Sequence, residues 1–252
     1  MSPFFPFGPD LAFNRAAAAA VWPSPPFRHA LCERSTRLGS LHPAEAELMA
    51  GAGPGRVWDF RAGRHCARQV LAALGHAGIP VLMDAHGAPR WPRDVVGSIS
   101  HSGGKAIAVA TRDPAIRAVG ADIQMLAWPF PREALPFLFR PEEIRVILGA
   151  GPRHADHHAY AVFSAKESVM KCCCAAFGCL PEMTAVLIEM DLAEGIFRAR
   201  TPGWPACGDF HGSGVAGRVG FDGSHVLTGI WLRQAPRPGR MLRSIQHQRS
   251  EL

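Results

Sequence analysis

Three short segments of the sequence place polar side chains in patterns that could serve chemistry. The first, residues 97–104, reads Gly-Ser-Ile-Ser-His-Ser-Gly-Gly, so a strand runs into a turn rich in hydroxyls and glycine. Such a turn, with Ser100 and His101 in it, offers backbone N–H groups, hydroxyls and an imidazole to a phosphate. Taken alone, the segment fits an ordinary turn at the end of a strand even better.

The second segment, residues 119–124, reads Val-Gly-Ala-Asp-Ile-Gln and puts an acidic residue inside an apolar strand. Burying a carboxylate is costly unless a cation or strong hydrogen-bond donors accept it. Asp122 and Gln124 are two residues apart, so their side chains leave the same face of a strand. Two oxygen donors on one face suit Mg²⁺. The alternative is an aspartate at a strand end that caps a turn.

The third segment, residues 163–171, reads Phe-Ser-Ala-Lys-Glu-Ser-Val-Met-Lys within a long helical pattern. Glu167 and Lys171 are four residues apart and therefore share a face of the helix. An exposed ion pair at this spacing is common and contributes only about 0.2–0.5 kcal/mol. The apolar neighbours Phe163 and Met170 argue against a fully solvated face.

Together the three segments indicate more than any one of them. A carboxylate on a strand, a carboxylate and a lysine on a helix, and a turn that can bind phosphate make up a site for magnesium and pyrophosphate. Phosphoryl transfer requires little else than positioning, a metal and positive charge near the leaving group.

Hydrophobic periodicity and turn residues predict the elements that would position these segments. Residues 1–42 read as irregular and then weakly strand-like. Helices are predicted over 43–52, 58–77, 141–149 and 155–177. Strands are predicted over 79–83, 95–99, 105–111 and 118–124, and again in four stretches of 184–232, with a hairpin turn at Asp222-Gly223.

The order of helix, strands, helix and strands predicts an α+β fold in two comparable halves. We place an N-terminal lobe at residues 1–118 and a C-terminal lobe at 119–252, with a frayed tail at about 236–252. The chain has 252 residues, of which 48% are hydrophobic, enough to bury a sizeable core. No repeat is evident in the sequence.

Composition narrows the class of protein. The net charge of +6 suits an anionic partner, but lysine and arginine are spread along the chain, so no nucleic-acid stripe is indicated. The seven cysteines are odd in number and contain no CxxC pair, which favours reduced thiols in a cytoplasmic protein and no structural zinc. No apolar run approaches 18 residues, and the N-terminus does not resemble a signal peptide, so we expect no membrane association.

The three polar segments resemble the signature of the 4′-phosphopantetheinyl transferases. Those proteins carry a Gly-(Ile/Val)-Asp-X-Glu strand and, further along, a (Phe/Trp)-Ser-X-Lys-Glu-(Ser/Ala)-X-X-Lys helix. The stretches 63–68 (Gly-Arg-His-Cys-Ala-Arg) and 87–92 (Gly-Ala-Pro-Arg-Trp-Pro) are similar to the enterobactin-synthetase type of the larger, single-chain subgroup. The resemblance runs from about residue 55 to 175, with these segments in the right order.

The resemblance implies an enzyme that moves the phosphopantetheine arm of coenzyme A onto a serine of an acyl or peptidyl carrier protein and releases 3′,5′-ADP. It also implies a pseudo-twofold fold of two similar lobes, each a small sheet with helices, with coenzyme A between them. A chain with two such halves needs no partner to complete its site, so we expect a monomer.

The resemblance also implies roles for individual residues. Asp122, Gln124 and Glu167 would hold Mg²⁺, with Mn²⁺ as an alternative metal. Lys171 would contact the pyrophosphate and stabilise the departing nucleotide, and Glu167 or a water beside the metal would take the proton of the carrier serine. The predicted contacts to coenzyme A are Arg56, Arg64, His86, Ser100, His101 and Lys171.

One departure from the family pattern bears on activity. The family usually has glutamate where this chain has Gln124, and an amide oxygen can ligate magnesium but brings no charge. The first alternative is therefore an inactive relative that binds coenzyme A or a carrier domain. A nucleic-acid-binding protein and another Mg²⁺-dependent phosphotransferase are weaker alternatives, the latter because no GxxxxGK[ST] loop occurs.

Overall fold

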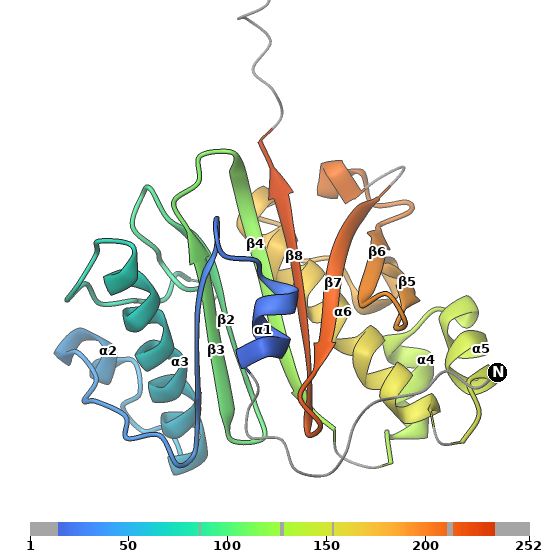
Figure 1. Ribbon diagram of the computed structural model, residues 1–252, viewed down its shortest axis with the longest axis horizontal. Helices are drawn as coiled ribbons and strands as arrows, with labels where there is room; N and C mark the ends of the chain where they lie inside the picture. Colours follow the sequence, from blue (N-terminus) through green and yellow to red (C-terminus); the bar gives the residue numbers. More distant parts are fainter. Residues whose placement is uncertain (1–14, 86, 127–128, 153, 211–213, 235–252) are drawn as a thin grey trace, which may run out of the picture.

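Two antiparallel sheets lie side by side in the centre of the structure, a computed structural model in which residues 15–85, 87–126, 129–152, 154–210 and 214–234 are described (Figure 1). The first sheet has the strand order β1-β3-β2, and the second has the order β4-β8-β7-β6-β5. The strands are β1 (Arg28–Glu33), β2 (Val96–Ser102), β3 (Lys105–Thr111), β4 (Ile116–Met125), β5 (Leu187–Asp191), β6 (Ile196–Arg200), β7 (Val215–Phe221) and β8 (His225–Arg233).

Helices cover the sheets. The α-helices are α1 (Arg15–Val21), α2 (Pro43–Glu47), α3 (Pro54–Ala73), α4 (Leu135–Leu138), α5 (Pro141–Gly149) and α6 (Ala155–Phe177), with 3₁₀ turns at Arg132–Ala134, Met183–Ala185 and Pro205–Phe210. The long helix α3 packs on the first sheet, and the long helix α6 packs on β4 and β8 of the second. No helix among the described residues is both long and apolar enough to cross a membrane.

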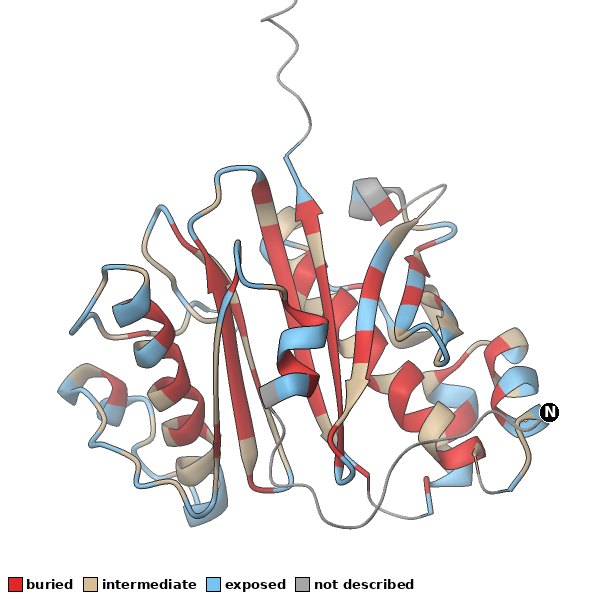
Figure 2. Ribbon diagram, viewed as in Figure 1, coloured by how far each residue is buried: buried red, intermediate tan, exposed pale blue. Residues whose placement is uncertain are grey.

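Side chains that alternate in direction along the inner strands divide the core into layers. Successive side chains of a strand point to opposite faces, so Ala106 and Ala108 of β3 pack under α3 while Ile107 packs on the other side. In β4, Val119 and Ile123 join Ile107 in a central layer between the two halves. Figure 2 shows that β3, β4 and β8 are buried along most of their length.

Helix α1 packs on β7 and β8, on the face opposite α6. Its contact is close because two of the facing strand residues are glycines: a Cβ on Gly229 would meet the Trp22 ring, and one on Gly220 would meet Val21. The N-terminal helix therefore belongs to the second sheet, although the first sheet follows it in the chain. The lobe boundary expected between residues 118 and 119 falls inside β4.

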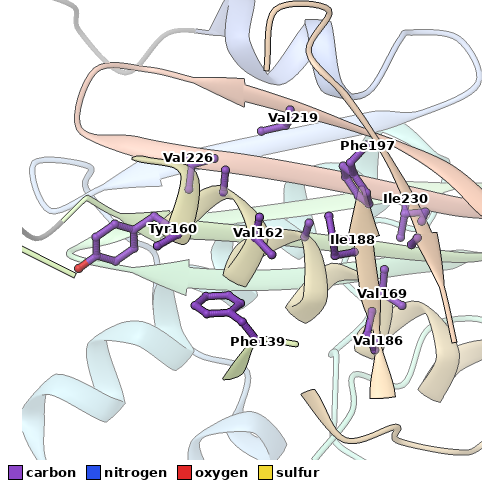
Figure 3. Packing of buried hydrophobic residues seen from close by; sticks show 14 of the residues in the cluster. Phe139, Tyr160, Val162, Val169, Val186, Ile188, Phe197, Val219, Val226 and Ile230 are labelled. Atoms are coloured by element: carbon purple, nitrogen blue, oxygen red, sulfur yellow. The ribbon is translucent and has the colours of Figure 1, made fainter. Parts of the chain in front are cut away.

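The largest apolar cluster lies between α6 and the second sheet (Figure 3). Val162 and Val169 of α6 face Phe197, Val226 and Ile230 of the strands, and all five side chains are at most 2% exposed. Burial of this kind stabilises a protein by about 1.5–3 kcal/mol for each large aliphatic or aromatic side chain. The cluster fixes the rotation of α6, and with it the direction of the polar residues on that helix.

The two sheets meet at a seam between β2 and β4 that has no backbone pairing among the described strands. Serine hydroxyls of β2 take its place: Ser98 Oγ accepts from Ala121 N at 3.0 Å, Ser100 Oγ from Ile123 N at 3.3 Å, and Ser102 Oγ from Met125 N at 3.0 Å. Each bond joins residues 23 positions apart, so the two strands run in parallel. Buried backbone amides need such partners.

A buried glutamate anchors each long helix in the same way. In the second half, Glu143 Oε2 accepts from Lys166 Nζ at 2.7 Å and from Arg140 N at 2.7 Å, and its Oε1 accepts from Ile188 N at 2.8 Å. Burial lowers the pKa of Lys166, and the neighbouring Glu143 carboxylate opposes that shift.

The first half repeats this arrangement. Glu45 Oε2 accepts from Arg68 at 2.6 Å and from His42 N at 3.1 Å, and its Oε1 accepts from Val81 N at 2.9 Å. Glutamate and cation are 23 positions apart here, as are Glu143 and Lys166. The two halves are thus built on one plan, although their sheets differ in size.

The α+β class with two antiparallel sheets confirms the fold predicted from the sequence. Several predicted elements are wrong in detail. No strand forms over 79–83, because Pro80 lacks an N–H and the Val81 backbone is bound by the side chains of Glu45 and Arg64. The predicted helix 58–77 runs instead from Pro54 to Ala73.

Lys166→Met is expected to lower the free energy of unfolding by about 3–5 kcal/mol, because Glu143 would keep a buried charge without its cation. Urea unfolding followed by circular dichroism measures the loss. The matched control is Arg200→Met, which breaks the more exposed pair with Glu189 and is expected to cost at most about 1 kcal/mol. Equal losses in the two variants would contradict an anchoring role for the buried pair.

Candidate active site

Asp122 lies where β2, β4 and α6 meet, and only 1% of the residue is exposed. Its Oδ1 accepts hydrogen bonds from Lys171 Nζ at 2.6 Å and Ser100 Oγ at 2.7 Å. Its Oδ2 accepts from Ser164 Oγ at 2.9 Å and from Gln124 Nε2 at 2.9 Å. Four donors from three elements therefore stabilise the buried carboxylate, as its burial requires.

The close approach of α6 to β4 depends on Gly120. A Cβ at this position would overlap the backbone carbonyl oxygen of Ser168, so only glycine lets the helix lie so near the strand. Because side chains two apart on a strand share a face, Asp122 points at the same helix as Gly120. Lys171 Nζ reaches across the gap and also contacts Ala121 O at 3.3 Å.

Glu167 lies one turn before Lys171 on α6 and is half-buried. Its carboxylate makes no hydrogen bond to any described residue, in contrast to that of Asp122. Burial raises the pKa of Glu167, the Lys171 ammonium lowers it, and the Asp122 charge adds to the increase. The charges of Asp122 and Glu167 therefore act on each other, and a cation bound near both carboxylates would relieve that repulsion.

His101 stands at the end of β2 on the rim of this site. Its Nδ1 lies 3.6 Å from Asp59 Oδ2 of α3. Burial lowers the pKa of His101, the Asp59 charge opposes that shift, and the cations Arg56 and Lys171 add to it. The imidazole thus lies within electrostatic reach of both long helices.

The start of α3 adds a second source of positive potential. Arg56 is exposed in the first turn, after the sequence Gly-Pro-Gly, and it makes no ion pair with a described residue. No side chain caps this helix end, so its first N–H groups remain available. A helix N-terminus beside an arginine and an imidazole attracts phosphate.

The remaining predicted residues are placed differently. Arg64 is 5% exposed, its Nε donates to Val81 O at 2.5 Å, and its guanidinium lies 4.2 Å from the centre of the Phe60 ring. Burial lowers the pKa of Arg64 to about 10. Ser100 is bound to Asp122 and to the seam, and His86 lies outside the described residues.

Sequence reasoning missed two hydroxyls that support Asp122. Ser164, fully buried on α6, lies 2.9 Å from Thr228 Oγ1, and Thr228 pairs with Asp122 in the register of β4 and β8. Ser164 stands inside the segment that drew attention to Glu167, so the sequence held a signal for it. Thr228 lies far along the chain in an apolar strand, and nothing local distinguished it.

Comparisons with known proteins agree with this geometry. A family model described as the 4′-phosphopantetheinyl transferase N-terminal domain matches residues 44–111, and one described as the 4′-phosphopantetheinyl transferase superfamily matches residues 118–213. The 4′-phosphopantetheinyl transferase Svp of Streptomyces mobaraensis is 34% identical over 193 residues, which cover 75% of this chain and 78% of that protein. The chain belongs to the 4′-phosphopantetheinyl transferase superfamily.

Other members of the superfamily match shorter stretches. The 4′-phosphopantetheinyl transferase Npt of Nocardia iowensis is 35% identical over 130 residues, covering 52% of this chain and 57% of that protein. Enterobactin synthase component D of Escherichia coli (strain K12) is 34% identical over 121 residues, which cover 48% of this chain and 56% of that protein. The family and the enzyme class expected from the sequence are confirmed.

A divalent metal is typical of this superfamily, and the donor set here fits one. Asp122 and Glu167 bring two carboxylates together, and Glu167 has an unbound carboxylate whose pKa is raised in part by the charge of Asp122. Within the described part of the chain, no group of three or more His, Cys, Asp and Glu side chains could hold a metal. The amide of Gln124 lies beside Asp122 and donates to its carboxylate through Nε2.

Gly120→Ala is expected to abolish transfer and to destabilise the fold, because the added methyl group and the Ser168 carbonyl oxygen cannot occupy the same space. Thermal unfolding and a carrier-modification assay measure the two effects. Gly149→Ala, at the end of α5 with no atom within 4 Å of the added Cβ, is the control and should behave as wild type. A Gly120→Ala protein with native stability would show that α6 does not lie this close to β4.

Proposed function

We propose that this chain transfers the 4′-phosphopantetheine group of coenzyme A to a serine hydroxyl of an acyl or peptidyl carrier protein and releases 3′,5′-ADP. The observation that supports the proposal most directly is the pairing of Asp122 with Lys171 where β2, β4 and α6 meet, with Glu167 one turn before Lys171 on the same helix and within reach of both charges. Two carboxylates and an ammonium are what a diphosphate and its metal require.

Asp122 and Glu167 would hold Mg²⁺ or Mn²⁺ between the strand and the helix. A metal bound there would neutralise the diphosphate oxygens of the coenzyme. Lys171 would donate to the same diphosphate and stabilise the charge that develops on the departing nucleotide. Its side chain is 30% exposed, so the ammonium can move from Asp122 toward a ligand in the site.

Arg56 and His101 would bind the other phosphate groups of the coenzyme. Both lie at the junction of α3 and the end of β2, and the open N-terminus of α3 adds unpaired N–H groups. Arg64 and Ser100 would support the site without contacting the coenzyme directly, because both are buried and already bound to neighbouring groups. His101 would donate most strongly when protonated.

Glu167, or a water beside the metal, would take the proton of the attacking serine. Burial raises the pKa of Glu167, and a metal bound to the same carboxylate would lower it again. The net charge of +6 would steer a carrier protein that is acidic around its serine. A monomer in the cytoplasm and no binding of nucleic acid remain predictions.

Intact-mass spectrometry of an apo carrier protein, incubated with coenzyme A, Mg²⁺ and this protein, tests the proposal. We expect a gain of one phosphopantetheine group, abolished by Asp122→Ala and by Glu167→Ala and retained by the exposed control Glu189→Ala. Coenzyme A binding without a mass gain on fatty-acid, polyketide and peptide carriers would contradict the proposal and favour an inactive relative.

Gln124→Glu is expected to lower the Mg²⁺ concentration needed for half-maximal transfer rate, because a third carboxylate adds charge next to the cation. Titrating Mg²⁺ at saturating coenzyme A and carrier measures this concentration. An unchanged titration curve would show that the side chain at this position does not influence the metal.

Glu167→Gln is expected to slow transfer by about 10²–10⁴-fold while raising the melting temperature at neutral pH without metal. The folded state holds the proton of Glu167 more tightly than the unfolded state does. The stability from this group is therefore present below the unfolded pKa and lost as the pH rises through the folded pKa. A glutamine at position 167 does not ionise, so the variant keeps the stability that the wild-type protein loses as Glu167 becomes charged.

Asp122→Asn is the contrasting variant for this experiment. It leaves the Lys171 ammonium without its partner and should lower the melting temperature at the same pH. If both substitutions changed the melting temperature in the same direction, the two carboxylates would not have the different roles assigned to them.

A further inference from the structure

The amide of Gln124 is held at both ends. Its Nε2 donates to Asp122 Oδ2 at 2.9 Å, and its Oε1 lies 3.4 Å from Ser102 Oγ, which donates to it. Ser102 Oγ accepts from Met125 N at 3.0 Å through a lone pair, and its single proton goes to the amide oxygen. The nitrogen of the amide thus faces the carboxylate, and the oxygen faces away from it.

The acceptor character of the Asp122 carboxylate selects this orientation of the Gln124 amide. A carboxylate oxygen is only an acceptor, so Asp122 attracts the amide nitrogen and repels the amide oxygen. A glutamate at position 124 would instead place a second negative oxygen against Asp122 Oδ2. Without a cation the two charges would repel each other, whereas the amide contributes a charge-assisted hydrogen bond.

The turn between β2 and β3 and the turn between β7 and β8 together position Ser102, which binds the oxygen of the amide. His225 Nε2 lies 3.1 Å from Ser102 O, and Asp222 Oδ1 accepts from His225 N at 2.7 Å. Lys105 joins the turns through a 2.8 Å ion pair with Asp222, whose carboxylate is buried. The position of Ser102, and so of the Gln124 oxygen, is fixed by contacts outside the site itself.

We propose that Gln124 is a positioning residue that holds the Asp122 carboxylate by a hydrogen bond, rather than a metal ligand. Asp122 then keeps its place whether or not a cation is bound, and Asp122 and Glu167 alone are the ligands from the chain. This inference rests on the metal site of the proposed function and replaces the expectation from the sequence that Gln124 is a ligand.

Thermal unfolding of the whole chain in EDTA tests the positioning role. Gln124→Met is expected to melt about 2–8 °C below wild type, because the loss of one charge-assisted bond leaves Asp122 Oδ2 with a single donor. Gln124→Glu should melt at least as low in EDTA and should regain the difference in millimolar Mg²⁺, which a merely structural defect would not do. Gln234→Glu, an exposed position beyond β8, is the matched control.

Binding of Mn²⁺, followed by the electron paramagnetic resonance signal of the free ion, tests the ligand assignment. Gln124→Met is expected to lose at most about tenfold in affinity, as for a group that acts through a ligand, while Asp122→Ala loses binding altogether. A Gln124→Met protein that melts as wild type does in EDTA but binds no Mn²⁺ would overturn the proposal.

The two readouts also separate this inference from the proposed function. Absence of Mn²⁺ binding in the wild-type protein would overturn the metal assignment of both, and the EDTA melting series would still decide whether Gln124 positions Asp122. A carrier that gains no mass would contradict the transferase proposal and leave the melting series unaffected.

Discussion

The burial of one carboxylate shapes the rest of this structure. Asp122 is almost inaccessible to water, and a charge in that position is stable only if several donors converge on it. Those donors come from β2, β4 and α6, so the same bonds that stabilise the carboxylate also tie the two sheets and the long helix together. The site and the junction between the halves are therefore one network.

The acidic side chains at the two long helices differ in how completely they are bound. Glu45 and Glu143 each have a cation and two backbone N–H partners, and they serve as anchors for α3 and α6. Glu167 has no hydrogen-bond partner among the described residues, and its pKa is raised by burial. An acid left unsatisfied beside a satisfied one is the pattern of a site prepared for a ligand.

Sequence periodicity was enough to predict the residues that share a face, such as Asp122 with Gln124 and Glu167 with Lys171, because those spacings are local. It did not predict α1, whose run of alanines has no amphipathic pattern and whose partners lie on β7 and β8. The serine seam was equally hidden, since it joins residues of two sheets that no local rule connects. The structural repeat of Glu45 with Arg68 and Glu143 with Lys166 could be recognised only once their contacts were known.

Amide hydrogen exchange along β4 tests most directly whether the serine seam and Asp122 form one network. If they do, the amides of Ala121, Ile123 and Met125, which face β2 rather than β8, exchange slowly in the wild-type protein. Ser100→Ala should then speed exchange at Ile123 and slow transfer, whereas Ser98→Ala should speed exchange at Ala121 alone. Fast exchange at all three amides of the wild-type protein would contradict the account.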